Sequence, residues 1–369
     1  MSTNFENIQK LVRRAIAPIR PINPRTKVPE NLSSGAKRTL AGRELPPYYL
    51  IYFLLVDLLG FENYGQHEKI AWSVPIDFKE KAFLIEHRKF GIGIFVANPE
   101  SEENDAKQIV TLIKKGVKTA EPYFAWRAQQ AVKTSNLNVI NNSRWLFNRY
   151  KYLQSLYDKL VQDKKNFEGI KYYEIKNQII WIALDIIEAF FSWTEHIFIH
   201  LAILKNVVST GTEVADLAKK DWSEKFKAVL NLRKGRNKEL YDELLEIRRQ
   251  YRNFVAHGAF GKNGEAFTFH SGAGAVPVTL TEEKGRYLLG SVVDFDEDIV
   301  LSKISDFITY LWAGSNKPAY LYVQDSYLPL ILSLSKDGTY KKAMKSTANM
   351  KDLVQFLSYQ FDNAANMDW

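Results

Sequence analysis

The sequence predicts a mostly α-helical protein, a helical bundle with an N-terminal α+β module and a small C-terminal α+β extension. Two observations indicate this. Strand-like segments rich in aromatic and β-branched residues are concentrated before residue 100, whereas residues 141–257 show apolar residues at helical spacing only. We therefore expect three domains, namely 1–140, 141–313 and 314–369, and the role of the first is not evident.

The N-terminal module alternates helical and strand patterns. We expect a helix at Phe5–Ile19, a connector over 21–35, a helix at Leu50–Gly60, two or three strands within Ile70–Ala97, and a helix at Asn104–Lys133. The connector is rich in Pro, Ser and Asn, which favour turns over regular elements.

The bundle is expected to contain five helices. They are Arg144–Lys164, Tyr172–Lys205, Thr212–Leu232, Lys238–His257 and Asp296–Trp312, with a glycine-loop hairpin (266–269 and 276–280) before the last. In the extension, an Asp-Gly turn at 337–338 predicts a hairpin of Leu328–Leu334 with Tyr340–Met344, followed by a helix at Met350–Phe361.

The composition excludes several classes of site. The 369 residues include no Cys, so disulfides, Cys-based zinc sites, iron–sulfur clusters and thiol nucleophiles are excluded. The N-terminal residues lack the basic and apolar regions of a signal peptide, and we expect a cytoplasmic protein.

No membrane span is expected. The apolar segment at 48–56 is too short to cross a bilayer. The longer segment Ile179–Leu204 contains six polar residues that fall on one helical face, as in an amphipathic helix of a bundle. These residues are Asp185, Glu188, Ser192, Glu195, His196 and His200.

The segment that suggests chemistry is Arg252-Asn253-Phe-Val-Ala-His257-Gly258, which spells Arg-x4-His at the end of a basic helix. When spacings of four to six residues are all allowed, chance alone gives about 0.8 Arg-x4–6-His matches in a chain of this composition, so the spacing is weak evidence by itself. Its position at the end of an amphipathic helix inside a bundle strengthens the interpretation.

Residues 141–313 resemble the HEPN superfamily (higher eukaryotes and prokaryotes nucleotide-binding domain). The resemblance rests on RNFVAHG at 252–258, the long helix at 183–204 and the basic connector at 225–240. It implies a metal-independent endoribonuclease without cofactor, assembled from two protomers, with catalytic roles for Arg252, Asn253 and His257. It also implies a toxin or antiviral defence effector, and an antitoxin or regulatory partner.

The residue types fit such chemistry. His257 at a helix end could take a proton from a ribose 2′-OH or give one to the leaving 5′-oxygen. Arg252 would hold the scissile phosphate, and Asn253 could orient either group. Arg252 and His257 lie ~140° apart on one helix, which favours a site shared by two copies. The apolar side of Ile179–Leu204 would supply part of that interface.

Basic residues surround the motif. Residues 220–262 contain eleven Lys or Arg and six Asp or Glu. This segment therefore carries +5 of the formal net charge of +8 of the whole chain. This pattern predicts RNA as the partner. The expected RNA-binding residues are Arg233, Lys234, Arg236, Arg248 and Arg249.

Structural and non-catalytic interpretations of these residues remain open. Arg252 could simply pair with Glu188 or Glu195, the carboxylates that would otherwise orient it, and His257 could be an ordinary helix-ending residue. The protein could also be a non-catalytic HEPN-like RNA- or nucleotide-binding module, or a protein–protein interaction module. Family members that are neutralised by tyrosine modification carry Tyr two residues after the His, where this chain has Ala259.

Two other constellations are considered. Glu195, His196 and His200 have a feasible metal-ligand spacing, but we expect a polar stripe in the bundle and no metal. Asp77, Glu86 and Lys89 resemble a nuclease pattern on a hairpin, and here we expect a charged outward edge, because Glu86 and Lys89 would point to opposite faces.

Overall fold

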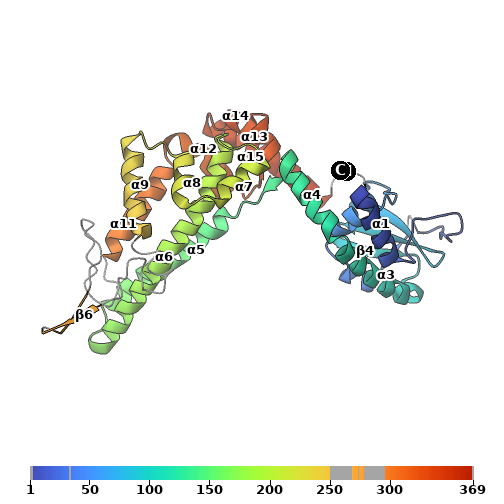
Figure 1. Cartoon of the computed structure of the whole chain (residues 1–369), viewed down its shortest axis with the longest axis horizontal. Coiled ribbons are helices and arrows are strands. Elements are labelled where there is room, and N and C mark those ends of the chain that lie inside the picture. Colours follow the sequence, from blue (N-terminus) through green and yellow to red (C-terminus); the bar gives the residue numbers. More distant parts are fainter. Residues whose placement is uncertain (1–2, 33–34, 250–267, 273, 278–295, 368–369) are drawn as a thin grey trace. The chain divides into compact units, whose positions relative to one another are not determined.

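The computed structural model describes residues 3–32, 35–249, 268–272, 274–277 and 296–367 (Figure 1). It forms two compact units, Met1–Val132 with Phe356–Trp369, and Lys133–Gln355. The chain is mostly helical with one small antiparallel sheet in its first unit, as the sequence predicts for the fold class. The division into three domains stays a prediction.

The first unit contains short and long helices around a four-stranded sheet. Its helices are α1 (Thr3–Ile16), η1 (Ala41–Glu44), α2 (Tyr48–Tyr52), the π-helix η2 (Phe53–Leu58), α3 (Pro99–Thr119) and α4 (Glu121–Thr134), which runs on into the second unit. Its strands are β1 (Lys37–Arg38), β2 (Ile70–Phe78), β3 (Lys81–Arg88) and β4 (Gly91–Val96). The predicted helix over 104–133 is thus two helices that meet at Ala120.

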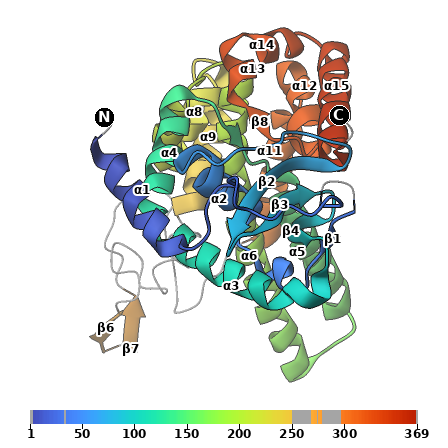
Figure 2. The same cartoon turned by 90° about the vertical axis from the view of Figure 1, so that its right-hand side faces the viewer.

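The sheet is antiparallel, with strand order β1-β4-β3-β2, and Figure 2 shows the strands side by side. A two-residue turn joins β2 to β3, and both its residues, Lys79 and Glu80, have positive φ. Such a turn matches the twist of paired strands, which makes it the common short hairpin connection. The register pairs Val74 with Ile85 and Asp77 with Ala82.

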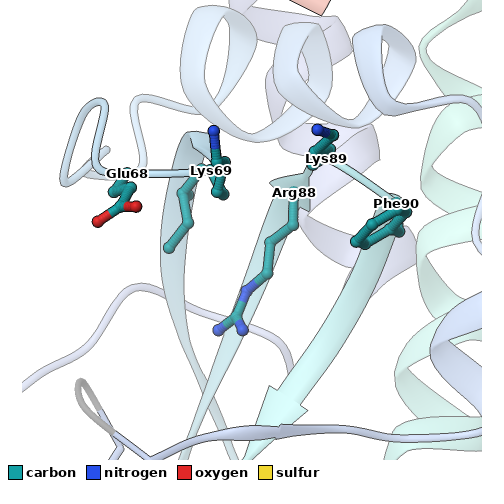
Figure 3. A pocket seen from close by; sticks show the side chains of 6 residues that line it. Glu68, Lys69, Arg88, Lys89 and Phe90 are labelled. Carbon is teal, nitrogen blue, oxygen red and sulfur yellow. The ribbon is translucent and has the colours of Figure 1, made fainter. Parts of the chain in front are cut away.

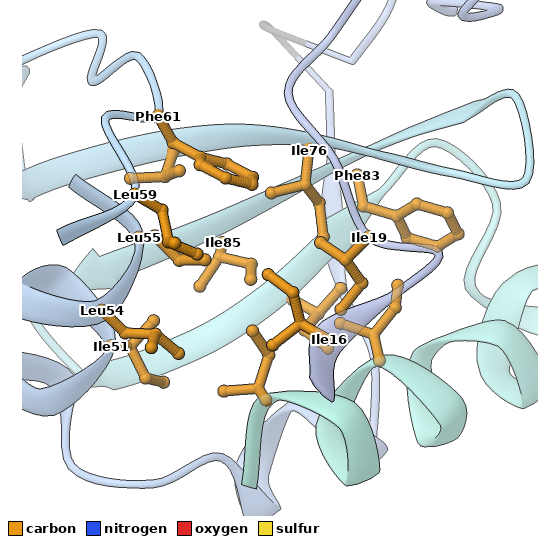
Figure 4. Packing of buried hydrophobic residues seen from close by; sticks show 14 of the residues in the cluster. Ile16, Ile19, Ile51, Leu54, Leu55, Leu59, Phe61, Ile76, Phe83 and Ile85 are labelled. Atoms are coloured by element: carbon orange, nitrogen blue, oxygen red, sulfur yellow. The ribbon is translucent and has the colours of Figure 1, made fainter. Parts of the chain in front are cut away.

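One face of this sheet forms the core of the first unit. Alternate residues of β2 and β3, such as Ile76 and Ile85, contact apolar residues of α1, α2, η2 and α3 (Figure 4). The opposite face has a smaller cluster, in which Leu32 of the Pro-rich connector packs on Leu84 and Phe95. The connector therefore covers the second face of the sheet.

The second unit is the helical bundle. Its helices are α5 (Ser143–Lys164), α6 (Gly169–Leu204), α7 (Gly211–Lys219), α8 (Trp222–Val229), α9 (Gly235–Ile247), α11 (Glu297–Leu311), η4 (Gly314–Asn316), α12 (Lys317–Tyr320), η5 (Leu321–Asp325), α13 (Leu332–Lys336), α14 (Thr339–Ala343) and α15 (Thr347–Asn366), whose end belongs to the first unit. Its strands form two short ladders, β5 (Asn138–Val139) with β8 (Leu330–Ile331), and β6 (Thr268–Ser271) with β7 (Gly274–Pro277).

Aromatic side chains fill the centre of this bundle. Phe190 and Phe198 of α6 contact Phe307 of α11, and Phe198 also packs on Trp222 and Phe226 of α8. All five rings are fully buried. The long helix α6 runs beside α5 and supplies the central contacts of the unit (Figure 1).

The single helix predicted over Thr212–Leu232 is wrong, because α7 and α8 are separate. Asp221 begins α8 by accepting the backbone N–H of Glu224 at 2.8 Å, and the Glu224 side chain returns to the Asp221 N–H. This reciprocal cap satisfies two N–H groups that a new helix leaves open. The Asp-x-x-Glu pattern was therefore the signal for the break.

The hairpin predicted in the C-terminal extension is also wrong. The turn is where it was expected, with Gly338 at φ 80°, but α13 and α14 flank it. A glycine with positive φ ends helices as readily as it turns hairpins. Tyr340 is buried within α14, where its hydroxyl lies 2.9 Å from that of Tyr322. The last helix, α15, confirms the prediction for that segment.

Among the described residues, one helix, α6, is long and apolar enough to cross a membrane. However, 72% of its most apolar window is buried inside the protein. That burial is typical of the core helix of a bundle. The sequence interpretation of α6 as an amphipathic helix agrees with this placement.

Candidate functional site

The proposed catalytic residues Arg252, Asn253 and His257 lie outside the described residues, so their arrangement stays a prediction. The structure describes the helix that leads to them. Helix α9 ends at Ile247, and Arg248 still has helical backbone angles. Leu240 and Leu244 on α9 are buried in the bundle, which fixes one face of this helix.

A cluster of charges joins α9 to the bundle core. Glu195 of α6 accepts from the ammonium of Lys225 at 3.0 Å, and its other oxygen lies 3.8 Å from the guanidinium of Arg248. Lys225 is only 5% exposed, although it belongs to the basic helix α8. One carboxylate therefore ties α6 to both α8 and the end of α9. We call these three residues the Glu195 cluster.

This cluster brings together two of the predicted site residues. The sequence interpretation gave Glu195 the task of orienting Arg252 and gave Arg248 to RNA; the structure places Arg248 beside Glu195, and both roles stay predictions. Whether Glu195 also reaches Arg252 is outside the described residues. Lys225 was not singled out from the sequence. Its burial depends on a carboxylate thirty positions earlier, which no local pattern indicates.

Three of the residues that were expected to bind RNA lie in the α8–α9 connector and the first turn of α9. Arg233, Lys234 and Arg236 are exposed, and Arg236 pairs with Glu239 at 3.2 Å; their binding of RNA stays a prediction. The connector is fixed from within by Asn237, whose amide donates to the carbonyl of residue 231 and accepts the hydroxyl of residue 310. The preformed loop can therefore present its cations to an anion.

Lys205, at the end of α6, adds a cation that the sequence analysis missed. Its ammonium donates to the carbonyl oxygen of Val229 at 3.0 Å. Burial and the nearby Lys234 lower the pKa of Lys205 to about 8. The end of α6 thus lies beside the end of α8 and near Lys234 of the connector. Arg249, after α9, is exposed as well.

The two histidines of α6 serve a structural role. The backbone N–H of Asn142 donates to Nε2 of His196 at 3.0 Å, which occupies the free lone pair of that ring. The Nδ1 of His200 lies 2.9 Å from the carbonyl oxygen of His196. Burial, followed by His200, lowers the pKa of His196 to about 3, and burial lowers the pKa of His200 to about 4. Both rings are neutral at pH 7.

A metal on this pair is not favoured, because the acceptor nitrogen of His196 is already used. Among the described residues no group of three or more His, Cys, Asp or Glu side chains could hold a metal ion. Glu188, the second carboxylate expected to orient Arg252, is half-buried on α6. Its pairing with Arg252 stays a prediction.

The expectation of an outward charged edge at the β2–β3 hairpin is wrong for both acids. Asp77 is fully buried and accepts from the Thr26 hydroxyl at 2.6 Å and from Arg20 at 3.0 Å. Glu86 is nearly buried and accepts from the Ser73 hydroxyl at 2.7 Å and from Arg88 at 2.6 Å. These acids lie on the face that the connector covers. In the register of β2 and β3 the two acids lie four residues apart along the strand direction. They therefore form two separate polar contacts.

A shallow pocket of about 380 Å³ lies at the other end of this hairpin (Figure 3). It is lined by Glu68, Lys69, Ile70, Arg88, Lys89 and Phe90. Figure 3 shows the Arg88 side chain directed away from Lys89, and its guanidinium pairs with Glu86. The lining offers two lysines and one carboxylate, and it contains none of the predicted site residues.

Comparisons of this chain with protein-family models, with curated proteins and with solved structures each found no match.

Proposed function

We propose that this chain is a metal-independent endoribonuclease of the HEPN type. The observation that carries the proposal is the Arg252–Asn253–His257 motif, which follows a helix anchored in the bundle core through Arg248 and the Glu195 cluster. Because the end of α9 is held in place, the motif that follows in the sequence starts from a fixed point. Positioning of a phosphate requires such a fixed start.

The proposed reaction is attack of the ribose 2′-oxygen on the adjacent phosphate. His257 takes the proton of the 2′-OH or protonates the leaving 5′-oxygen, and two copies of the motif can divide these tasks. Arg252 stabilises the charge that develops on the phosphate oxygens. The products are a 2′,3′-cyclic phosphate and a free 5′-hydroxyl. This reaction requires neither a metal nor a cofactor.

We also propose that two copies assemble. The sequence interpretation assigned part of the interface to the apolar side of Ile179–Leu204, but that side is buried within the second unit. The exposed apolar residues of α6 lie near its beginning, where Ile170, Tyr173 and Trp181 share one helical stripe. Burial of this stripe against a second copy would remove its rings from water. Light scattering should give about twice 42.6 kDa, and Trp181→Glu should reduce it to the mass of one chain.

The biological role follows from the family resemblance alone. We propose a cytoplasmic toxin or antiviral defence effector that is held in check by an antitoxin or another regulatory partner. A second candidate function is non-catalytic RNA binding. The exposed Arg233 and Lys234 favour it, because phosphate contacts by these cations do not need the motif.

The deciding experiment is an RNA cleavage assay in EDTA, with the 3′ ends of the products analysed. The wild type should leave 2′,3′-cyclic phosphates, and His257→Ala should abolish cleavage. The matched control is His67→Ala, at an exposed histidine of the first unit. Cleavage that EDTA removes and a divalent ion restores would overturn the mechanism. Retained binding without cleavage by the wild type would favour the second candidate.

A further inference from the structure

The outer face of α5 carries an uncommon mixture of aromatic rings and cations. Trp145 is 69% exposed and Tyr152 is 63% exposed, although large aromatic side chains are usually buried. Arg149 and Lys159 are exposed as well. At 100° per residue these four side chains fall within an arc of about 80°. We call them the α5 ribbon, which is about 21 Å long at 1.5 Å per residue.

The cations of the α5 ribbon have no acidic partner within the described part of the chain. Helix α5 contains five Lys or Arg and only two Asp, and neither Arg149 nor Lys159 forms an ion pair among the described residues. The opposite side of α5 is occupied, because Tyr150 and Tyr157 are buried. The ribbon is thus a positively charged, aromatic surface that this unit itself does not use.

A cation and ring pair extends the ribbon at its beginning. The guanidinium of Arg144 lies 4.2 Å from the ring centre of Tyr327, which is exposed in the segment after η5. The carbonyl oxygens of Val323 and Leu328 accept from the Asn141 amide, and these bonds hold that segment at the start of α5. A third exposed ring therefore lies beside the helix in a fixed position.

We propose that the α5 ribbon binds single-stranded RNA, with unpaired bases stacked on Trp145 and Tyr152 and phosphates held by Arg149 and Lys159. Exposed rings between cations are the pattern by which proteins bind single strands without sequence readout. Paired bases would not offer their faces to these rings. The inference rests on the proposed function for the choice of RNA, and it assigns a substrate-holding surface that is separate from the motif.

An anionic membrane fits the ribbon less well. Helices that lie on membranes bury a continuous apolar face, with the charges on the opposite side. On α5 the continuous apolar face packs on α6, and the exposed rings alternate with charges. Single-stranded nucleic acid is therefore the polyanion that matches the arrangement.

The test measures binding of a labelled oligouridine of about twelve nucleotides, within the range of single-strand site sizes. The full-length His257→Ala protein is used, so that cleavage does not interfere. Trp145→Ala should weaken binding about tenfold, as expected for one lost stack, whereas Trp145→Phe should keep most of the affinity. Arg149→Gln with Lys159→Gln should lower the slope of log K against log salt by about 1.4.

The matched controls lie on the C-terminal helices. Tyr359 on α15 is as exposed as Tyr152, and Lys341 and Lys351 are exposed cations. Tyr359→Ala should leave the affinity unchanged, and Lys341→Gln with Lys351→Gln should leave the salt slope unchanged. Equal effects of ribbon and control variants would overturn the inference. The inference would also be overturned if vesicles of anionic lipid bound the protein as tightly as the oligouridine does and if Trp145→Ala removed that binding.

Binding and cleavage are separate readouts here. If the wild type cuts no RNA but the ribbon variants lose oligouridine binding, the proposed catalysis fails and the ribbon stands. If the wild type cuts RNA and the ribbon variants bind oligouridine like the controls, the ribbon fails and the catalysis stands.

Discussion

Removing one partner of the Lys225–Glu195 pair should destabilise the second unit strongly. Breaking a buried ion pair costs about 3–5 kcal/mol, because the remaining charge stays in the core without compensation. Glu195 retains a side-chain exposure of 29%, so water offsets part of the loss. We therefore expect Glu195→Gln to cost about 2–3 kcal/mol of unfolding free energy. For a unit of this size, that is a fall of about 4–12 °C in melting temperature.

The assay is urea unfolding of four proteins, namely the wild type, Glu195→Gln, Lys225→Met and the double variant. Lys225→Met removes the buried ammonium, so the double variant should regain stability relative to Glu195→Gln alone. Glu239→Gln is the matched control, because its pair with Arg236 is exposed, and it should cost less than about 1 kcal/mol. A loss for Glu195→Gln no larger than for Glu239→Gln, with no gain in the double variant, would refute the reasoning.

Three further predictions concern the motif, the histidines of α6 and the sheet. Arg252→Ala and His257→Ala should each remove most cleavage, while the melting temperature measured by calorimetry stays within a few degrees of the wild type. If both variants unfold, Arg252 and His257 have a structural role instead. His196 and His200 have folded pKa values of about 3 and 4, below the ordinary 6.5. The unfolded chain therefore binds more protons, and stability is retained above pH 6.5 and lost as the pH falls toward 4. The two rings together contribute up to about 2.7 kcal/mol per pH unit, so His200→Leu should flatten the pH dependence of urea midpoints. Asp77→Ala should cost about 2–3 kcal/mol, because it leaves the buried Thr26 hydroxyl without its acceptor; a urea midpoint unchanged from wild type would contradict this.

Periodicity predicted the elements whose burial follows their own sequence. The helices α5 and α6 begin and end within a few residues of the prediction, and the strands β2 to β4 lie within the range predicted for two or three strands. Each has a main apolar face with the period of its backbone geometry, and the core covers that face. The hairpin predicted in the C-terminal extension was wrong because no such period is visible there. Leu332 and Tyr340 are buried on helices of five residues, which are too short to show a period.

Contacts between distant residues could not be predicted. Asp77 was expected at an outward edge, but its partners Arg20 and Thr26 lie more than fifty residues earlier, just before the connector and within it. Lys225 looks like a solvated residue of a basic helix until Glu195 of α6 is placed beside it. In both cases the sequence supplies the charge, whereas the partner depends on the tertiary fold.

The Glu195 cluster also bears on how the motif would be positioned. A buried ion pair stabilises a fold little beyond what apolar residues of similar size would, so stability alone does not explain a lysine in this core. What apolar residues would not provide is a carboxylate with a second oxygen directed to Arg248, four residues before Arg252 in the chain. The buried ammonium holds that carboxylate in place, and the carboxylate holds the end of α9. On this reasoning the charge in the core serves the position of the helix from which the proposed catalytic residues follow.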